Sequence, residues 1–497
     1  MAAEAVHRLI RQLTPEGVAL RWESVNFTRR DLHERADRIA GALAGLAGRP
    51  VAVRVPPGPD GYAALLGVLS AGAYLVWFGN GAVGERGRMI FDDVRPAAVL
   101  TAGCPDDLVD WYAEHTGITP VDVTELPEAP VSEVPVRPSD WAYLAHTSGS
   151  TGRPKGVPQT HAALAQFSLW FAATFGLGPG VRVGQWVHPE HDPAICETFA
   201  ALVSGAQLCP VPALTRTHPE RMLAWLGAEG VDVLQTVPSF ARELARASGP
   251  RPLPVRRLVL MGEAVPPELV AALHNRSPEL ELFNLYGPTE TVAATWCRIP
   301  RGEPRTAARW SANCPTVVPI GRAIPGREVL LLDEADGEAD EGEIVVLSPY
   351  VTPGYLRGGR DHPAFRPVPG RGPGPWYRTG DLGRRRPDGQ LEFRGRRDQQ
   401  VKVQGHRIEL AEIEAVLGEH PSVAECAVLA VPSDDGIVTS LVAYVVSRAD
   451  PAPQKQWRAR VRERFGDVLL PIRLRIVPGA LPRTTTGKVD VRRLTGM

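Results

Sequence analysis

Short runs of β-branched residues alternate with longer segments of helical period over most of the first 390 residues of the chain. Pro50–Val55 predicts a strand, and Tyr62–Ala71 predicts a helix soon after it. Val231–Thr236 and Arg257–Met261 repeat this pattern, each followed by a segment of helical period. Strands that alternate with helices form βαβ units, in which helices cover both faces of a parallel sheet. The pattern therefore predicts an α/β fold for this part of the chain.

The pattern changes after residue 396. The segments that follow predict a helix, two strands and another helix: Ile408–Leu417, Val423–Val431, Leu441–Val446 and Gln456–Phe465. These elements suffice for a small α+β domain of about 100 residues. Because 497 residues exceed one comfortable hydrophobic core, we expect two domains, residues 1–396 and residues 397–497.

Charge and cysteine usage narrow the class of protein. The formal net charge is −1 and no long run of one sign occurs, which argues against nucleic-acid and membrane-surface partners. The six cysteines are scattered without a CxxC spacing, so neither a disulfide framework nor a zinc site follows. The N-terminus is too charged for a secretory signal, and no apolar run is long enough to span a bilayer. We therefore expect a cytoplasmic protein.

Lysine is rare in this chain, with four lysines against 51 arginines. Three of the four, Lys155, Lys402 and Lys488, stand in glycine-containing motifs, whereas Lys455 lies in a polar stretch typical of a solvated surface. An ammonium group is compact, and a flat guanidinium of the same charge cannot enter the same space. Lys155, Lys402 and Lys488 are therefore candidate functional residues.

The run Thr147–Gly156 (TSGSTGRPKG) follows the short apolar stretch Trp141–Ala145. Glycines let backbone N–H groups turn toward an anion, hydroxyls add donors, and Lys155 adds charge, so the run favours a polyphosphate ligand. The spacing does not fit a Walker A loop. Taken alone, the run is also compatible with a flexible surface loop.

Four further motifs follow in order: Tyr286–Glu290 (YGPTE), Tyr377–Asp381 (YRTGD), Gly395–Lys402 (GRRDQQVK) and Thr486–Lys488 (TGK). With these motifs the chain resembles the adenylate-forming superfamily, and within it the amino-acid adenylation domains of nonribosomal peptide synthesis. The resemblance extends from Phe27–Ala36 to the lysine near the C-terminus.

The resemblance implies a large N-terminal domain, a small mobile C-terminal domain and two half-reactions between them. A carboxylate first attacks the α-phosphorus of Mg-ATP, which gives an acyl-adenylate and pyrophosphate. A pantetheine thiol on a carrier protein then displaces AMP and forms a thioester. ATP, Mg²⁺ and a phosphopantetheine-bearing partner are thus the implied cofactors and partner.

The resemblance also assigns roles at the triphosphate. Tyr286 would stack on adenine, Thr289 would bind the α-phosphate, and Glu290 would hold Mg²⁺, which needs few protein ligands because it keeps most of its waters. The residues that would cradle the β- and γ-phosphates are Thr147, Ser148, Gly149, Ser150, Thr151 and Gly152, with Lys155 nearby.

Five residues would act on the sugar, the domain movement and the transition state. Asp381 would accept both ribose hydroxyls, and Arg396 would add a donor to the same sugar. Asp398 would be the hinge of the small domain, and Gly405 would face the pantetheine tunnel. Lys488 would bridge the carboxylate and the α-phosphate as negative charge accumulates between them.

The segment His188–Phe199 aligns with the acyl-pocket element of the family, and Asp192 falls where amino-acid-activating members pair the substrate ammonium. Counting outwards from the motifs, the rest of the pocket would be Pro193, Cys196, Gln235, Val259, Met261, Leu285, Ala293 and Ala294. Because only Asp192 is charged, a charged substrate side chain would lack a partner, so we expect a neutral one. Two alanines and a glutamine leave room for a large substrate side chain, such as an aromatic one with a polar tip. The dipeptide Asp192-Pro193 is similar to that of free-standing enzymes that activate β-amino acids such as β-tyrosine.

The chain departs from the family pattern at His146, His191 and Cys196. Because His191 and Cys196 would reshape the pocket, α-amino-acid codes do not transfer directly to it. A metal site among His188, Glu190, His191 and Asp192 is a minor alternative, because no ligand spacing supports it.

The sequence leaves alternatives open for the partner protein and for the activity. The chain ends nine residues after Lys488, so we expect a separate peptidyl carrier protein to be loaded in trans, with an MbtH-like helper an open question. An acyl- or aryl-CoA ligase of the same superfamily is one alternative function. A non-catalytic nucleotide-binding relative is another.

Overall fold

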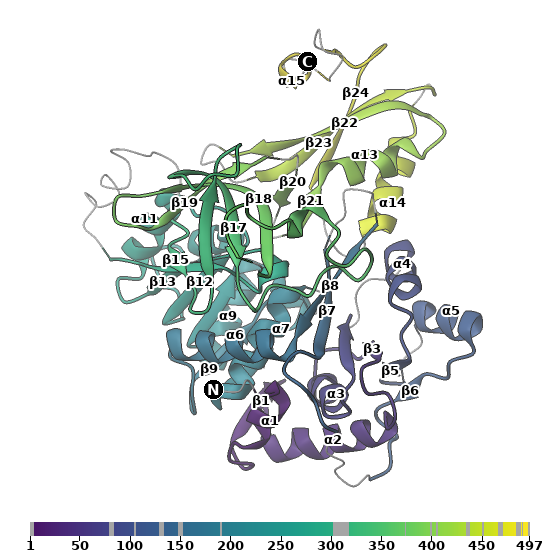
Figure 1. Ribbon diagram of the computed structural model, residues 1–497, viewed down its shortest axis with the longest axis vertical. Helices are drawn as coiled ribbons and strands as arrows, with labels where there is room; N and C mark the ends of the chain where they lie inside the picture. The colour runs from purple at the N-terminus through teal and green to yellow at the C-terminus, as the bar shows by residue number, and fades with distance from the viewer. Residues whose placement is uncertain are drawn as a thin grey trace.

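A computed structural model of the protein describes residues 4–78, 84–103, 106–128, 134–147, 153–188, 191–301, 318–372, 374–397, 400–403, 406–433, 438–449, 452–465, 471–483, 489 and 491–495. Two large sheets and their helices form the main body, and a smaller group of strands and helices from β20 onward lies at one end of it (Figure 1). The expected α/β fold is confirmed.

The first large sheet contains parallel strands β1, β9–β13 and antiparallel strands at both edges. In spatial order its strands are β15 (Arg322–Ala323), β14 (Thr295–Ile299), β13 (Glu281–Tyr286), β12 (Arg257–Met261), β11 (Val233–Thr236), β9 (Arg182–Gln185), β10 (Gln207–Pro210), β1 (Val18–Trp22) and β2 (Val25–Thr28). The predicted strands at Val231–Thr236 and Arg257–Met261 are thus central strands of this sheet.

The second large sheet is parallel except for its last strand. Its strands, in spatial order, are β6 (Val121–Asp122), β5 (Ala98–Thr101), β3 (Pro50–Val53), β4 (Tyr74–Trp77), β7 (Trp141–Thr147) and β8 (Lys155–Thr160). Both faces of β3 are buried: Val51 and Val53 face one hydrophobic cluster and Ala52 faces another. Burial on both faces explains why this strand is a continuous apolar run instead of an alternating one.

Helices separate and cover the two sheets. The layer between the sheets contains α2 (Arg29–Ala42), α3 (Pro59–Ser70), α6 (His161–Thr174) and α7 (Asp192–Ser204). The outer face of the six-stranded sheet is covered by α4 (Glu85–Val94) and α5 (Asp107–Thr116). The outer face of the nine-stranded sheet is covered by α9 (Pro219–Glu229), α10 (Pro238–Ala247) and α11 (Pro267–Arg276). Two shorter helices are α1 (Val6–Arg11) and α8 (Ala213–Arg216).

Helix α2 begins with a capping box. Thr28 accepts a hydrogen bond from the N–H of Asp31, and the Asp31 carboxylate accepts one from the N–H of Thr28 at 2.7 Å. This reciprocal arrangement satisfies two backbone donors that have no partner inside the helix. The helix then packs closely against α3 in the layer between the sheets.

A four-stranded antiparallel sheet follows the two large sheets in sequence. It consists of β16 (Glu328–Leu332), β17 (Glu341–Leu347), β18 (Trp376–Arg385) and β19 (Leu391–Arg396). Two 3₁₀ turns are η1 (Thr289–Thr291) and η2 (Pro363–Phe365), and Phe365 of η2 packs in the hydrophobic cluster of this sheet.

The last part of the chain starts with a hairpin, β20 (Gln400–Val403) and β21 (His406–Glu409). A three-stranded sheet of β22 (Val423–Pro432), β23 (Val438–Ser447) and β24 (Ile472–Ile476) follows. Helices α13 (Leu410–Gly418) and α14 (Gln454–Phe465) pack with the hairpin on one face of this sheet. Helix α15 (Val491–Thr495) lies on the other face, where Leu494 packs against Tyr444 and Val446. These elements match the predicted helix, strand, strand and helix.

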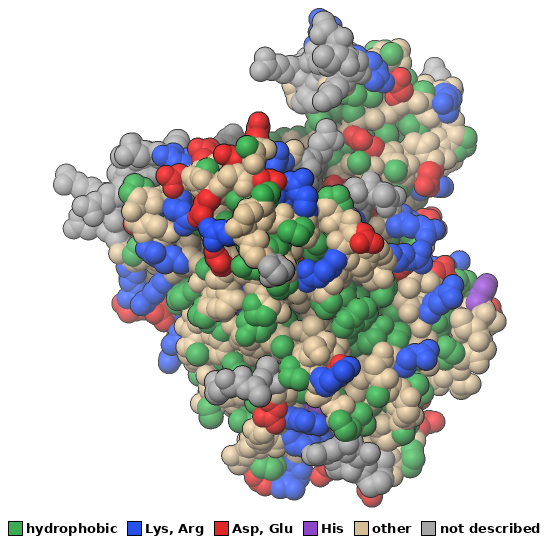
Figure 2. Space-filling view, viewed as in Figure 1, with side chains coloured by type: hydrophobic (Ala, Val, Ile, Leu, Met, Phe, Trp, Pro, Cys, Tyr) green, Lys and Arg blue, Asp and Glu red, His purple; other side chains and the backbone are tan. Residues whose placement is uncertain are grey.

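The surface is mixed in character. Basic and acidic side chains are interspersed over the face shown in Figure 2. In the portion of the chain that the structure describes, no helix combines the length and apolarity that a membrane span requires.

Candidate functional site

A tight turn after β13 lies at the centre of the candidate site. A Cβ atom at Gly287 would lie only 2.3 Å from the Cα of Ala293, so only glycine fits there. Val292 and Ala293 have left-handed backbone conformations, with φ of 48° and 64°. Such conformations are strained for residues with a Cβ, and persist where the surroundings hold them.

The buried guanidinium of Arg327 holds this turn. It donates hydrogen bonds to the carbonyl oxygens of Thr291, Val292 and Ala293, with the shortest at 2.8 Å to Ala293. Backbone carbonyls at irregular turns lack partners from regular secondary structure, so one guanidinium with several donors suits them well. Arg327 thus fixes the turn that carries Thr289, Glu290 and Ala293.

The glycine-rich run connects β7 to β8. Its ends, Thr147 and Lys155, are paired directly across the two strands, whereas Ser148, Gly149, Ser150, Thr151 and Gly152 lie outside the described residues. The Nζ of Lys155 lies 5.5 Å from the ring of Tyr355, and the hydroxyl of Tyr355 donates to Glu290 at 2.9 Å. The fold therefore brings both ends of the run close to the turn after β13.

Glu290 is 1% exposed and pairs with Arg407 from β21, with Nη1 of Arg407 3.2 Å from Oε2. Burial raises the pKa of Glu290, but Arg407 and the hydroxyls of Tyr377 and Tyr355 outweigh it and leave the pKa below its ordinary value. The carboxylate is thus ionised and faces a cation. A hard carboxylate in that state fits Mg²⁺, which Glu290 would hold when Arg407 is withdrawn.

The second group of site residues surrounds Asp381. Asp381 on β18 is paired in register with Arg396 on β19, and their side chains form a buried ion pair. The hydroxyl of Tyr286, at the end of β13, donates to the other oxygen of Asp381. The Nζ of Lys402 lies 5.8 Å from the Tyr286 ring, so this ring is next to a cation from the hairpin β20–β21. The structure therefore groups three of the residues expected at the nucleoside with Lys402.

The expected acyl-pocket residues come together on one face of the large sheet. Strand register places Gln235 beside Val259, and Met261 beside Leu285. Five of the predicted residues share one hydrophobic cluster with Phe167, Phe171 and Phe283: Cys196, Val259, Met261, Leu285 and Ala293. Ala294 packs instead in the cluster that contains Tyr286. Pro193 lies in the first turn of α7, beside Asp192.

Asp192 is the first residue of α7, where the helix dipole favours a negative charge. The hydroxyl of Tyr143 donates to its Oδ1 at 2.6 Å, and the hydroxyl of Thr289 is a second hydrogen-bond partner. Burial raises the pKa of Asp192 to about 7; Glu290 adds to this effect, and the two hydroxyls oppose it. Asp192 forms no ion pair with any described residue.

Three histidines lie where the hairpin meets the main body. The His191 ring is 4.5 Å from that of His406 on β21 and 6.3 Å from that of His188. Burial lowers the pKa of His406 to about 4 and that of His188 to about 3, so both are neutral at pH 7. Within the described residues no group of three or more metal-ligating side chains forms, and Glu190 lies outside them.

Three other predicted residues, Asp398, Gly405 and Lys488, lie outside the described residues. The nearest described residues on either side of Lys488, Arg483 and Val489, form an isolated β-bridge, and Arg483 pairs with Glu425 at 3.3 Å. Val489 and Leu481 pack on the face of the three-stranded sheet opposite the hairpin β20–β21. In Figure 1 helix α15 accordingly lies on the side of this sheet away from the main body. The last part of the chain thus meets the site with its hairpin.

Sequence reasoning missed four residues of this site: Tyr143, Tyr355, Arg327 and Arg407. Tyr143 stands in the apolar stretch before the glycine-rich run, where it is indistinguishable from a core tyrosine by sequence. Arg407 follows the predicted tunnel glycine by two residues, and this proximity to a motif was the one available signal.

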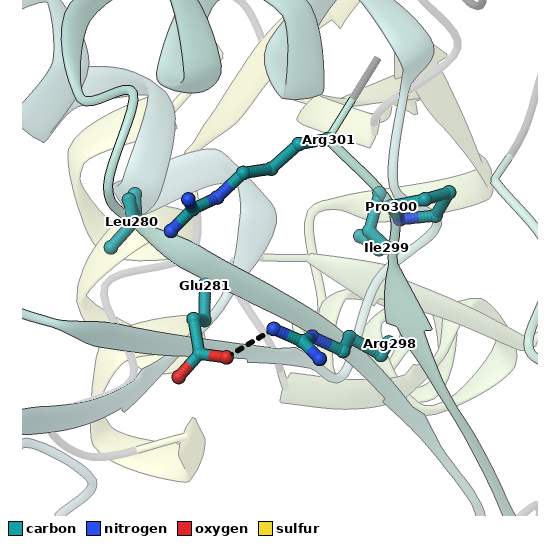
Figure 3. A pocket seen from close by; sticks show the side chains of 6 residues that line it. All are labelled: Leu280, Glu281, Arg298, Ile299, Pro300 and Arg301. Atoms are coloured by element: carbon teal, nitrogen blue, oxygen red, sulfur yellow. Dashed lines mark hydrogen bonds and ion pairs between the residues drawn. The ribbon is translucent and has the colours of Figure 1, made fainter.

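A separate surface pocket lies at the other end of β13 and β14 (Figure 3). It is lined by Leu280, Glu281, Arg298, Ile299, Pro300 and Arg301. Glu281 pairs there with both Arg298 and Arg257. Since Tyr286 is at the opposite end of β13, this pocket is separate from the candidate site.

Comparison with known proteins agrees with this arrangement. The family model for AMP-binding enzymes matches residues 10–356, and that for the AMP-binding enzyme C-terminal domain matches residues 412–488. An isonitrile lipopeptide synthase of Streptomyces coeruleorubidus is 36% identical over 503 residues, covering 97% of this chain and 32% of that protein. The phosphinothricin tripeptide synthetase PhsB of Streptomyces viridochromogenes is 35% identical over 506 residues, covering 97% of this chain and 41% of that protein. The chain therefore spans about a third to two fifths of the length of these relatives.

Two solved structures are similar over nearly the whole chain. Holo-PA1221, a nonribosomal peptide synthetase protein with adenylation and PCP domains, has a TM-score of 0.84 at 26% identity, covering 99% of this chain and 84% of that one. The amide bond synthetase McbA from Marinactinospora thermotolerans has a TM-score of 0.84 at 26% identity, covering 99% of each chain. Because the AMP-binding model alone matches more than half of its residues, the chain belongs to the AMP-binding enzyme family, the adenylate-forming superfamily.

Proposed function

We propose that this protein activates an amino acid as its aminoacyl-adenylate, with ATP and Mg²⁺. One observation carries the proposal: Asp192 is a carboxyl buried beside the acyl pocket without a cationic partner among the described residues. The other two carboxyls of the site, Glu290 and Asp381, each pair with an arginine. A buried carboxylate without a counter-charge is unfavourable, and the ammonium group of an amino acid would supply that charge.

The substrate side chain is proposed to be neutral, with an aromatic β-amino acid as one candidate. In this proposal the pocket wall consists of Val259, Met261 and Leu285, which pack with aromatic rings in one hydrophobic cluster. Gln235 adds an amide on the same sheet face. An apolar wall with one amide suits a large side chain with a polar tip, whereas a charged side chain would lack a partner.

We propose that the acyl group is then transferred to the phosphopantetheine thiol of a separate carrier protein. The similarity to PA1221, a protein with adenylation and PCP domains, supports a carrier as acceptor. The chain's similarity to an amide bond synthetase makes an amine the main competing acceptor, and free coenzyme A remains another.

We also propose that residues 397–497 form the mobile domain, with Asp398 as its hinge and Gly405 at the thiol tunnel.

Amino-acid-dependent ATP–pyrophosphate exchange tests the first half-reaction. The purified protein is assayed with neutral α- and β-amino acids, aryl acids and fatty acids, with and without an MbtH-like helper. Exchange with an amino acid, and its loss in Asp192→Asn, is expected. Exchange only with acids that lack an amino group would favour the CoA-ligase alternative, and nucleotide binding without any exchange would favour the non-catalytic one.

The acceptor is tested in a second assay, with the preferred acid, ATP and one of three nucleophiles: a holo-carrier protein, coenzyme A or a simple amine. A thioester on the carrier, detected as a mass increase, is the expected product. A CoA thioester or an amide in its place would reassign the second half-reaction while leaving the first intact.

A further inference from the structure

The carboxyl group of Asp192, at the start of α7, accepts a hydrogen bond from Tyr143, a residue of the six-stranded sheet. Tyr143 is on β7, and its side chain is completely buried. Its hydroxyl donates to Oδ1 of Asp192 at 2.6 Å and also contacts Cys196. The ring packs in the same hydrophobic cluster as Ala194 and Phe199 of α7. A ring in such a close-packed core has one position, so the direction of its hydroxyl is fixed.

The protonation state of Tyr143 makes it a permanent donor. Burial and the adjacent Asp192 raise the pKa of Tyr143 well above its ordinary value, so the phenol stays protonated. A hydrogen bond donated to a carboxylate favours the ionised form of that carboxylate. It also restricts rotation of the carboxyl group, which is otherwise broad about its terminal torsion.

We propose that Tyr143 is a positioning residue for amine recognition: its hydroxyl orients the Asp192 carboxylate toward the ammonium group of the substrate. Tyr143 acts through Asp192 and touches no reacting atom. This inference rests on the proposed function, in which Asp192 binds an amino acid. It adds a residue from a second sheet, 49 positions away in sequence, to the recognition of the amine.

Tyr62 provides a matched control. It is also completely buried, lies in the same hydrophobic cluster, and donates its hydroxyl to Oε1 of Gln185 at 2.6 Å. Replacement of either tyrosine by phenylalanine removes one oxygen atom and its buried hydrogen bond to an oxygen of a polar side chain. The two variants therefore carry the same kind of structural loss, but only Tyr143→Phe removes a partner of Asp192.

The experiment compares two ligands that differ only in the amino group. The KM and kcat of ATP–pyrophosphate exchange are measured with the preferred amino acid, and its desamino counterpart is measured as a competitive inhibitor. In Tyr143→Phe the KM for the amino acid is expected to rise by about 10- to 100-fold, the loss typical of a hydrogen bond to a charged group. The kcat and the Ki of the desamino acid are expected to stay near their wild-type values. In Tyr62→Phe neither ligand should be affected.

A double-mutant cycle gives a second readout. In an Asp192→Asn background, Tyr143→Phe is expected to have little further effect on amino-acid binding, because the two residues act through one interaction. An equal weakening of both ligands in Tyr143→Phe, a KM no different from Tyr62→Phe, or independent effects in the cycle would overturn the proposal. Wild-type protein that shows no amino-acid-dependent exchange would instead overturn the proposed function itself.

Discussion

At the scale of single residues, the site is defined by three buried carboxyl groups with different partners. Asp381 is paired with Arg396 of the neighbouring strand, and Glu290 with Arg407 of the hairpin. Within the described part of the chain Asp192 has hydroxyl partners and no ion pair, and its pKa is raised to about 7, chiefly by burial. The state of each carboxyl therefore depends on which cation reaches it.

The raised pKa of Asp192 predicts a pH-dependent affinity for the amino acid. Below about pH 7 the carboxyl is protonated and cannot pair with an ammonium group, whereas above pH 7 it is ionised. The KM for the amino acid should therefore fall as pH rises through 7, then level off, changing about tenfold per pH unit on the acid side. Exchange kinetics between pH 5.5 and 8.5 measure this, and Asp192→Asn should give a weak and nearly flat profile. A flat wild-type profile would contradict the prediction.

The same raised pKa has a consequence for the stability of the empty protein. Because the folded pKa exceeds the ordinary value of 3.8, the contribution of Asp192 to stability is full below pH 3.8 and is lost as pH rises through 7. An amino acid that supplies the missing cation should offset this loss, so the gain in melting temperature on adding it should be larger at pH 8 than at pH 6. Differential scanning fluorimetry with Asp192→Asn as the control measures this gain, and an equal gain at both pH values would contradict it.

Lys488 is predicted to act in adenylate formation alone. Removing one preorganised charge from a transition state typically costs about 10²- to 10³-fold in rate. Lys488→Ala should therefore nearly abolish exchange, yet form thioester normally from supplied aminoacyl-adenylate. Lys455→Ala is the matched control, because Lys455 is an exposed lysine of α14. Equal loss of both half-reactions in Lys488→Ala would contradict the prediction that Lys488 acts in adenylate formation alone.

At the scale of elements, the hairpin β20–β21 delivers two cations to the main body. Lys402 and Arg407 are paired in register across it, so both approach the site together. Arg407 forms an ion pair with Glu290, the carboxylate that is proposed to hold Mg²⁺, and Lys402 lies beside the ring of Tyr286. Binding of the hairpin in this position and binding of Mg²⁺ at Glu290 should therefore compete.

Arg407→Gln is predicted to impair the step that uses this position of the hairpin. The Glu290 carboxylate would lose its buried partner, and the docked hairpin would be destabilised, since breaking a buried ion pair costs about 3–5 kcal/mol. Thioester formation from supplied adenylate should fall by at least about tenfold, with less effect on exchange. Arg460→Gln removes a more exposed ion pair, with Glu419, in the same part of the chain and should leave both steps unchanged. A selective loss of exchange in Arg407→Gln would contradict this assignment.

At the scale of the whole molecule, the last part of the chain is joined to the main body by ion pairs and a histidine contact. Arg464 of α14 pairs with Glu85 of α4 at 3.2 Å, and Arg407 pairs with Glu290. The rings of His191 and His406 meet between them. These ion pairs are polar contacts, which are typical of surfaces between parts that move relative to each other.

Acid is predicted to separate these two parts. Burial lowers the pKa of His406 to about 4 and that of His191 well below its ordinary value, whereas both should return toward about 6.5 once exposed to water. The docked arrangement is thus fully favoured above pH 6.5 and weakened as pH falls toward 4. The radius of gyration from X-ray scattering should increase between pH 7.5 and 5 while far-UV circular dichroism stays constant.

His406→Asn should reduce this pH dependence, whereas His115→Asn, at an exposed residue of α5, should leave it unchanged. A radius that stays constant to pH 5, or that changes only together with loss of secondary structure, would contradict the prediction.

The sequence by itself determined the main helices and strands and the functional groups that the motifs supply. Continuous apolar runs identified central strands such as β12, because strands buried on both faces have no polar positions. The order of the motifs identified the family, since each motif keeps the residue types that its ligand requires. The pocket alignment also brought together Cys196, Val259, Met261, Leu285 and Ala293, which pack in one cluster.

Only the tertiary structure decided which charges meet. Tyr143 and Asp192 are 49 residues apart, and Arg407 and Glu290 are 117 residues apart, so no local pattern links them. Burial is likewise a property of the packed chain, and it is the main reason that the pKa of Asp192 rises to about 7. The sequence supplied the carboxylates and the cations; the packing of two sheets and a hairpin pairs Glu290 and Asp381 with arginines, and pairs Asp192 with none of the described cations.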